Sequence, residues 1–103
     1  MPLNQNPEET RRHGAEELEG LRRMVLAWRE HYFRSAPARG GEEYLFLCRD
    51  FSQEIEEYIY PYVSRMVVTD HIDQDQAREF MGFCFQQVLE LQDYLDIGDG
   101  SPN

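Results

Sequence analysis

The sequence lacks hydrophobic runs long enough to cross a membrane, and it has only two cysteines. Its longest apolar runs fall far short of the roughly 20 residues that a spanning helix needs. Cys48 and Cys84 are too few for a disulfide framework and lack the spacing of a zinc site. We expect both to be reduced, buried thiols. The first residues contain no apolar segment behind a basic region, so we expect no secretory signal and a cytoplasmic location.

Several chemical motifs are also missing. The sequence contains no Glu-x-x-His pair, which carboxylate-bridged dimetal bundles use, and no glycine-rich phosphate loop. Both cysteines lie in apolar stretches, and such surroundings raise the pKa of a thiol instead of activating it. We therefore expect no metal, no cofactor and no enzymatic activity.

Lysine is absent, and positive charge is scarce in one part of the chain. Residues 1–41 hold seven arginines and six acidic residues, a formal charge of +1, whereas residues 42–103 hold three arginines and fourteen acidic residues, a charge of −11. The negative electrostatic field of residues 42–103 repels nucleic acid and anionic lipid. We expect neither to bind directly, and we expect a protein partner with a basic surface.

What is present indicates a folded helical domain. A chain of 103 residues with 41% hydrophobic residues and thirteen aromatics is not typical of disorder. Its size predicts one domain that buries about two thirds of the surface of the unfolded chain. We divide it into a polar N-terminal tail (1–7), a single helical bundle domain (8–97) and a polar C-terminal tail (98–103).

Apolar residues recur at three- and four-residue steps in three segments, the spacing of amphipathic helices. The first segment is clearest over residues 15–34 and precedes a Pro- and Gly-containing connection at 35–41. The second covers 42–68. The third follows a predicted capping box, Asp73 with Gln76, and ends at Gly98. The residues expected to face the core are Leu18, Leu21, Val25, Trp28 and Tyr32 in the first; Tyr44, Cys48, Phe51, Ile55, Tyr58 and Tyr62 in the second, with Ile59, Val63 and Met66 beside them; and Ala77, Phe80, Met81, Cys84, Val88, Leu91 and Leu95 in the third.

Pro61 lies inside the second segment, where its ring and missing N–H cost about 3 kcal/mol or more in a regular helix. The apolar spacing continues across it, which favours a kinked continuous helix over a break. The sequence thus predicts an all-α fold, a three-helix antiparallel (up-down-up) bundle with a Pro-kinked middle helix. Apolar residues cover about half the circumference of the third helix, so either the other two helices or a second copy in a dimer must cover it. Gly82, in a phenylalanine-rich turn, indicates a close approach between helices.

A row on the face of the second helix opposite the core combines aromatic, amide and acidic residues: Phe46, Asp50, Gln53, Glu57 and Tyr60. Rings supply contact area, and carboxylates select an arginine-bearing surface. The row is our candidate partner-binding site. In the alternative, Phe46 and Tyr60 pack against the first helix or the connecting loop. The first helix offers a basic and apolar row for this, formed by Arg22, Leu26, Arg29 and Phe33.

These features favour a small acidic cytosolic interaction protein, an adaptor, assembly factor or regulator, that binds a basic partner through its second and third helices. Two other classes remain. One is an acidic nucleic-acid mimic that occupies the DNA- or RNA-binding groove of another protein. The other is a helical enzyme or small-ligand carrier with a tyrosine-lined pocket near Trp28, Tyr58 and Tyr62.

Overall fold

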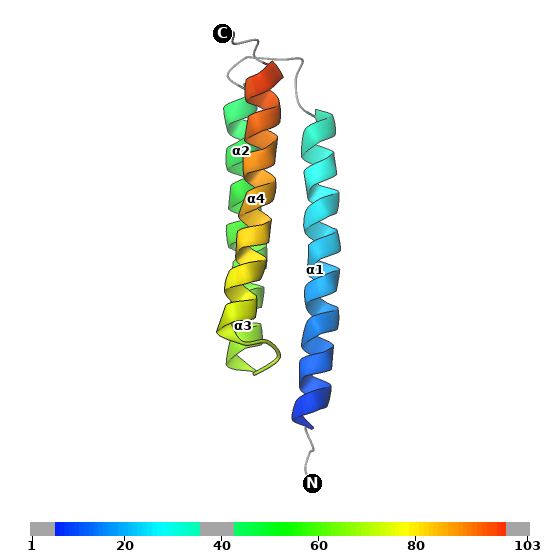
Figure 1. Ribbon diagram of the computed structural model, residues 1–103. Helices are drawn as coiled ribbons and strands as arrows, with labels where there is room; N and C mark the ends of the chain where they lie inside the picture. Colours follow the sequence, from blue (N-terminus) through cyan, green and yellow to red (C-terminus); the bar gives the residue numbers. More distant parts are fainter. Residues whose placement is uncertain (1–5, 36–42, 99–103) are drawn as a thin grey trace.

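The protein is all-helical in the part of the chain that a computed structural model describes, residues 6–35 and 43–98, where no strand occurs (Figure 1). The elements are α1 (Pro7–Ser35), α2 (Glu43–Glu54), the π-helix η1 (Ile55–Ile59), α3 (Tyr60–Val68) and α4 (Gln74–Gly98). Since α2, η1 and α3 follow one another without a gap, they form one continuous helical segment, and the protein has three such segments. Most of the predicted tails and of the 35–41 connection lies outside the described residues.

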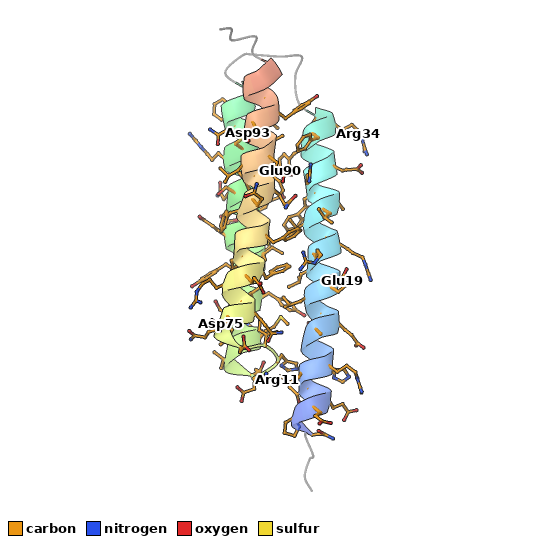
Figure 2. All side chains as sticks on the ribbon, in the orientation of Figure 1. Arg11, Glu19, Arg34, Asp75, Glu90 and Asp93 are labelled. Atoms are coloured by element: carbon orange, nitrogen blue, oxygen red, sulfur yellow. The ribbon has the colours of Figure 1, made fainter. Side chains whose placement is uncertain are left out.

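The core lies between these segments and contains most of the residues that the spacing predicts. Figure 2 shows side chains filling the space between α1 and α4. The buried hydrophobic residues are Leu21, Val25, Tyr32, Phe51, Ile55, Ile59, Val63, Met66, Ile72, Phe80, Cys84, Leu91 and Leu95. Leu18, Trp28, Cys48, Ala77, Met81 and Val88 are partly buried against them. The side chain of Tyr44 lies outside the described set. Ile72, which lies between the second and third predicted helical segments, is an unexpected member.

The π-helix changes which residues of the second segment face the core. Tyr58 is 64% exposed and Tyr62 46% exposed, while Ile59 and Val63 are buried, so the prediction that both tyrosines face the core is wrong. In η1 the Tyr60 N–H bonds the carbonyl of Ile55, five residues earlier, instead of the carbonyl four residues earlier. The wider turn contains one extra residue, so the aliphatic neighbours of the tyrosines face the core and the tyrosines face outward.

Pro61 explains where this wider turn forms. Proline has no N–H to offer the carbonyl of Glu57, and its ring crowds the preceding turn of a regular α-helix. The π turn ends at Ile59, and Pro61 then occupies the start of α3, a position where proline fits without losing a helical bond. The helical segment therefore continues past the proline.

Two local motifs define the turn between α3 and α4. The His71 N–H bonds the Met66 carbonyl at 2.8 Å and the Asp70 N–H bonds the Val67 carbonyl at 3.0 Å, the pair that ends a helix in a Schellman motif. The predicted capping box at the start of α4 is confirmed. The Gln76 N–H bonds Asp73 Oδ1 at 2.7 Å, and the Asp73 N–H bonds Gln76 Oε1 at 2.9 Å.

Side chains of α1 reach both other segments. Glu17 contacts Tyr62 of α3, and Tyr32 contacts Glu54 of α2. On the side of α4, Arg29 contacts Glu90, and the rings of Phe33 and Tyr94 lie 4.9 Å apart. The molecule that results is elongated, 64 × 21 × 17 Å.

The close approach between helices is not where the sequence analysis placed it. Gly82 is exposed, and a Cβ there would meet nothing within 4 Å, so that expectation is wrong. The close approach occurs at Gly14 of α1, which is buried. Within the described ranges, no helix combines the length and apolar character that crossing a membrane requires.

Candidate functional site

All five residues of the predicted row are exposed, and they come from three consecutive elements. Phe46, Asp50 and Gln53 lie on α2, Glu57 on η1 and Tyr60 on α3. Phe46 is 54% exposed and Tyr60 56% exposed, although rings of this size are usually well covered in a folded domain. We call these residues the acidic row.

Contacts between neighbours order parts of the acidic row. Gln53 Nε2 donates a hydrogen bond to Glu57 Oε2 at 2.9 Å, one turn further along. The guanidinium of Arg49 lies 5.6 Å from the centre of the Phe46 ring, within range of a cation–π contact. Neither contact uses a residue from another helix.

Carboxylates of the acidic row border a shallow polar hollow of about 270 Å³ between α1 and the second helical segment. Its lining residues are Tyr32, Asp50, Gln53, Glu54, Glu57 and Tyr58. The Tyr32 hydroxyl donates a hydrogen bond to Glu54 Oε1 at 2.9 Å. Burial and this carboxylate together raise the pKa of Tyr32, so the tyrosine stays neutral and keeps donating. The described lining thus holds three carboxylates and no cationic side chain. A hollow with this lining is complementary to a positively charged group.

Sequence reasoning missed Tyr32, Glu54 and Tyr58 as neighbours of this hollow. Tyr32 lies on another helix, and no spacing within the chain pairs it with Glu54. Tyr58 was assigned to the core. Its outward position would have followed from noticing that the aliphatic residues Ile55, Ile59 and Val63 recur at steps of four.

Tyr60 is set apart from the rest of the acidic row. It borders a different hollow of about 410 Å³, which is lined by residues of α3 and α4. The row that appears continuous on a helical projection is therefore divided between two grooves. The carboxylates lie beside α1, and the last aromatic residue lies beside α4.

The basic and apolar row of α1 does not cover the acidic row, because its arginines turn to α4. The guanidinium of Arg22 lies 4.4 Å from the centre of the Phe83 ring. Arg29 Nη1 donates to Gln87 Oε1 at 2.8 Å and contacts Glu90 Oε1 at 2.9 Å. More than half of each of Phe46 and Tyr60 stays exposed, so α1 does not bury them. The connecting loop, the other half of that alternative, lies outside the described residues.

Tyr58 and Tyr62 border two separate surface hollows. Tyr62 lies in a hollow of about 260 Å³ with Glu17, Arg65 and His71, and its hydroxyl donates a hydrogen bond to Glu17. That bond raises the pKa of Tyr62, with a smaller contribution from burial. Tyr58 lies in the polar hollow beside the acidic row.

The chemistry that the remaining reactive groups can perform is limited by their surroundings. Cys84 is buried, and burial raises the pKa of its thiol to about 12, so the nucleophilic thiolate does not form near neutral pH. Cys48 is partly buried. In the described ranges, no three His, Cys, Asp or Glu side chains gather in an arrangement that could hold a metal ion.

The fold and the acidic row together define an all-helical acidic protein with a carboxylate-rich, partly aromatic surface. Comparisons with protein-family models, with curated proteins and with solved structures find no match to this chain.

Proposed function

We propose that this protein is a small acidic protein–protein interaction module, an adaptor, assembly factor or regulator of the cytoplasm. It binds a basic partner through its second and third helical segments. The observation that carries the proposal is the exposure of the whole acidic row on a part of the chain, residues 42–103, with a charge of −11. Exposed rings at such a surface supply contact area, and the carboxylates attract and orient arginine.

The scaffold in this proposal is an antiparallel up-down-up bundle whose middle helix is kinked near Pro61. The pairs Glu17 with Tyr62 and Tyr32 with Glu54 support opposite directions for α1 and the second segment, since rising numbers on one meet falling numbers on the other. The pairs Arg29 with Glu90 and Phe33 with Tyr94 support the same direction for α1 and α4. A π turn just before a proline is a common origin of a kink.

Charge reversal in the acidic row tests the proposal. We expect Asp50→Arg combined with Glu57→Arg to abolish co-purification of the partner, while circular dichroism stays helical because both side chains are exposed. Glu16→Arg combined with Glu30→Arg is the matched control, since it changes the net charge equally at exposed positions of α1. Undiminished co-purification with the acidic-row variant would exclude this function.

An acidic nucleic-acid mimic is the second candidate, and the shape of the molecule favours it. A rod of 64 × 21 × 17 Å with exposed carboxylates along it presents a long anionic surface; Figure 2 shows Asp75 and Asp93 near opposite ends of α4. A mimic binds a nucleic-acid-binding protein with steep salt dependence, and an oligonucleotide competes for that protein. Partner binding that an oligonucleotide leaves unchanged would exclude the mimic but not the interaction module.

A further inference from the structure

The hollow between α3 and α4 is the most apolar of the surface hollows described. Its apolar lining comprises Tyr60, Val63, Val67, Val68, Ala77 and Met81. Val63 is buried and forms the floor, whereas Val68 is 80% exposed and Tyr60 56% exposed. With about 410 Å³, the hollow has room for more than one large apolar side chain. All its described lining residues belong to α3 or α4, so α1 does not close it.

The charge around this hollow is negative. Residues 60–81, the span that contains its whole described lining, hold four acidic residues and two arginines. Arg78 is the cation in the lining, and its Nη1 lies 2.9 Å from Asp75 Oδ1, so a carboxylate already offsets its charge. An apolar floor inside an acidic surround is complementary to an apolar side chain flanked by basic ones.

The same charge argues against a second copy as the occupant. Each copy carries a formal charge of −10, and an isologous contact would bring the acidic surround of one hollow against that of the other. Like charges placed together at an interface are unfavourable. A partner with the opposite charge meets no such repulsion.

We propose that the α3–α4 hollow receives the apolar face of an amphipathic, arginine-bearing helix of the partner. The groove between two neighbouring helices is a site where a third helix lays its apolar residues, at the three- and four-residue spacing of its own face. The bound helix adds a fourth segment to the bundle. This inference rests on the proposed function and names the class of partner segment.

A designed peptide provides the probe. It is an amphipathic helix of about 18 residues, long enough to form a helix on binding, with leucines on one face and arginines beside them. The comparison peptide keeps every arginine and has serine in place of each leucine. Fluorescence anisotropy measures the binding of both peptides to the full chain.

Two variants of the protein locate the contact. Val68→Arg places a charge at the hollow, while Leu89→Arg makes the same change at an apolar α4 residue that is 53% exposed and outside the hollow. Because both positions are exposed, we expect both variants to fold. We expect the leucine peptide to bind at least about tenfold more tightly than the serine peptide, and Val68→Arg, but not Leu89→Arg, to remove this advantage.

Three results would overturn the inference. The first is that the two peptides bind equally, or that the leucine peptide does not bind. The second is that Val68→Arg and Leu89→Arg reduce the binding of the leucine peptide equally. The third is that light scattering finds a dimer and that Val68→Arg dissociates it. Asp50 and Glu57 do not line this hollow, so the charge-reversal test of the acidic row succeeds or fails independently.

Discussion

The backbone carbonyl oxygen of His71 lies against Gly14, at a point 2.0 Å from where a Cβ atom on that glycine would be. Gly14 is in the second turn of α1, and His71 is in the turn that ends α3. A residue with low helix propensity therefore occupies a helix interior because any side chain would displace the α3–α4 turn. The contact fixes the position of α1 against that turn, which also holds the buried Ile72.

This contact predicts opposite effects for two glycine substitutions in one helix. Gly14→Ala forces the His71 backbone away, and we expect a loss of about 1–3 kcal/mol in the free energy of unfolding, typical of overpacking. Gly20→Ala meets nothing within 4 Å, so we expect a gain of up to about 1 kcal/mol from helix propensity. Urea unfolding of both variants checks the difference. A Gly14→Ala protein as stable as Gly20→Ala would contradict the contact.

Much of the fold could be predicted because it depends on local patterns. The helix over 42–68 and the capping box of Asp73 and Gln76 before the last helix follow from spacing and composition, and the structure has them within a residue. The register after Ile55 was predicted wrongly, because a regular helical period gives tyrosine and isoleucine equal weight; only the four-residue spacing of the aliphatic residues Ile55, Ile59 and Val63 indicates it. A π turn depends on Pro61 and on the cost of burying hydroxyl groups, which periodicity does not measure.

The shifted register predicts which of two adjacent residues supports the fold. Ile59 is fully buried, so we expect Ile59→Ala to lower the free energy of unfolding by about 2–5 kcal/mol. Tyr58 is mostly exposed, and we expect Tyr58→Ala to stay within about 0.5 kcal/mol of the parent. Thermal or urea unfolding distinguishes the two. If Tyr58→Ala destabilised the protein more than Ile59→Ala, the regular helical register would describe this segment better than the shifted one.

The candidate site was harder to predict than the fold. The acidic row is visible in the sequence as a helical face, but its exposure depends on where α1 lies around the second segment. Arg22 and Arg29 do not cover the row, because they contact α4: Arg22 packs on the ring of Phe83, and Arg29 forms an ion pair with Glu90. Tertiary packing determines which helix these arginines contact, and the spacing of residues within a single helix does not reveal it.

A backbone constraint at Asp70 predicts a stabilising substitution. Asp70 has φ of 65°, the left-handed region that favours glycine, at the position that follows the end of α3. We expect Asp70→Gly to raise the free energy of unfolding by about 0.5–1 kcal/mol. Asp70→Ala is the control, since it removes the same charge and keeps a Cβ. Equal stability of the two variants would show that the left-handed conformation carries no penalty here.

The one buried polar side chain among the described residues, Gln87, depends on Arg29. Its Oε1 accepts from Arg29 Nη1 at 2.8 Å, and its Nε2 donates to the Phe83 carbonyl at 3.0 Å. We expect Arg29→Leu to lower the free energy of unfolding by about 1–3 kcal/mol, because it leaves a buried acceptor unsatisfied. Arg34→Leu, at an exposed ion pair with Glu30, should change it by less than about 1 kcal/mol.

A double-mutant cycle separates that contact from the lost contact with Glu90. We expect Arg29→Leu combined with Gln87→Leu to destabilise the protein by less than the sum of the single changes. Additive losses, measured by urea unfolding, would show that the two side chains do not depend on each other.

Burial of Cys84 predicts a pH dependence that its removal abolishes. The pKa of this thiol is about 12 in the folded protein, against an ordinary value of 9.0 that we assign to the unfolded chain. Between these values the unfolded chain has released a proton that the folded protein keeps, so the free energy of unfolding falls as the pH rises. Cys84→Ala lowers stability by a constant amount from the small cavity but removes this slope. Since Tyr32 titrates in both proteins, the difference between their slopes in urea unfolding from pH about 8 to about 10.5 isolates Cys84. Parallel slopes would mean that the thiol ionises as readily in the folded protein as in the unfolded chain, in conflict with its full burial.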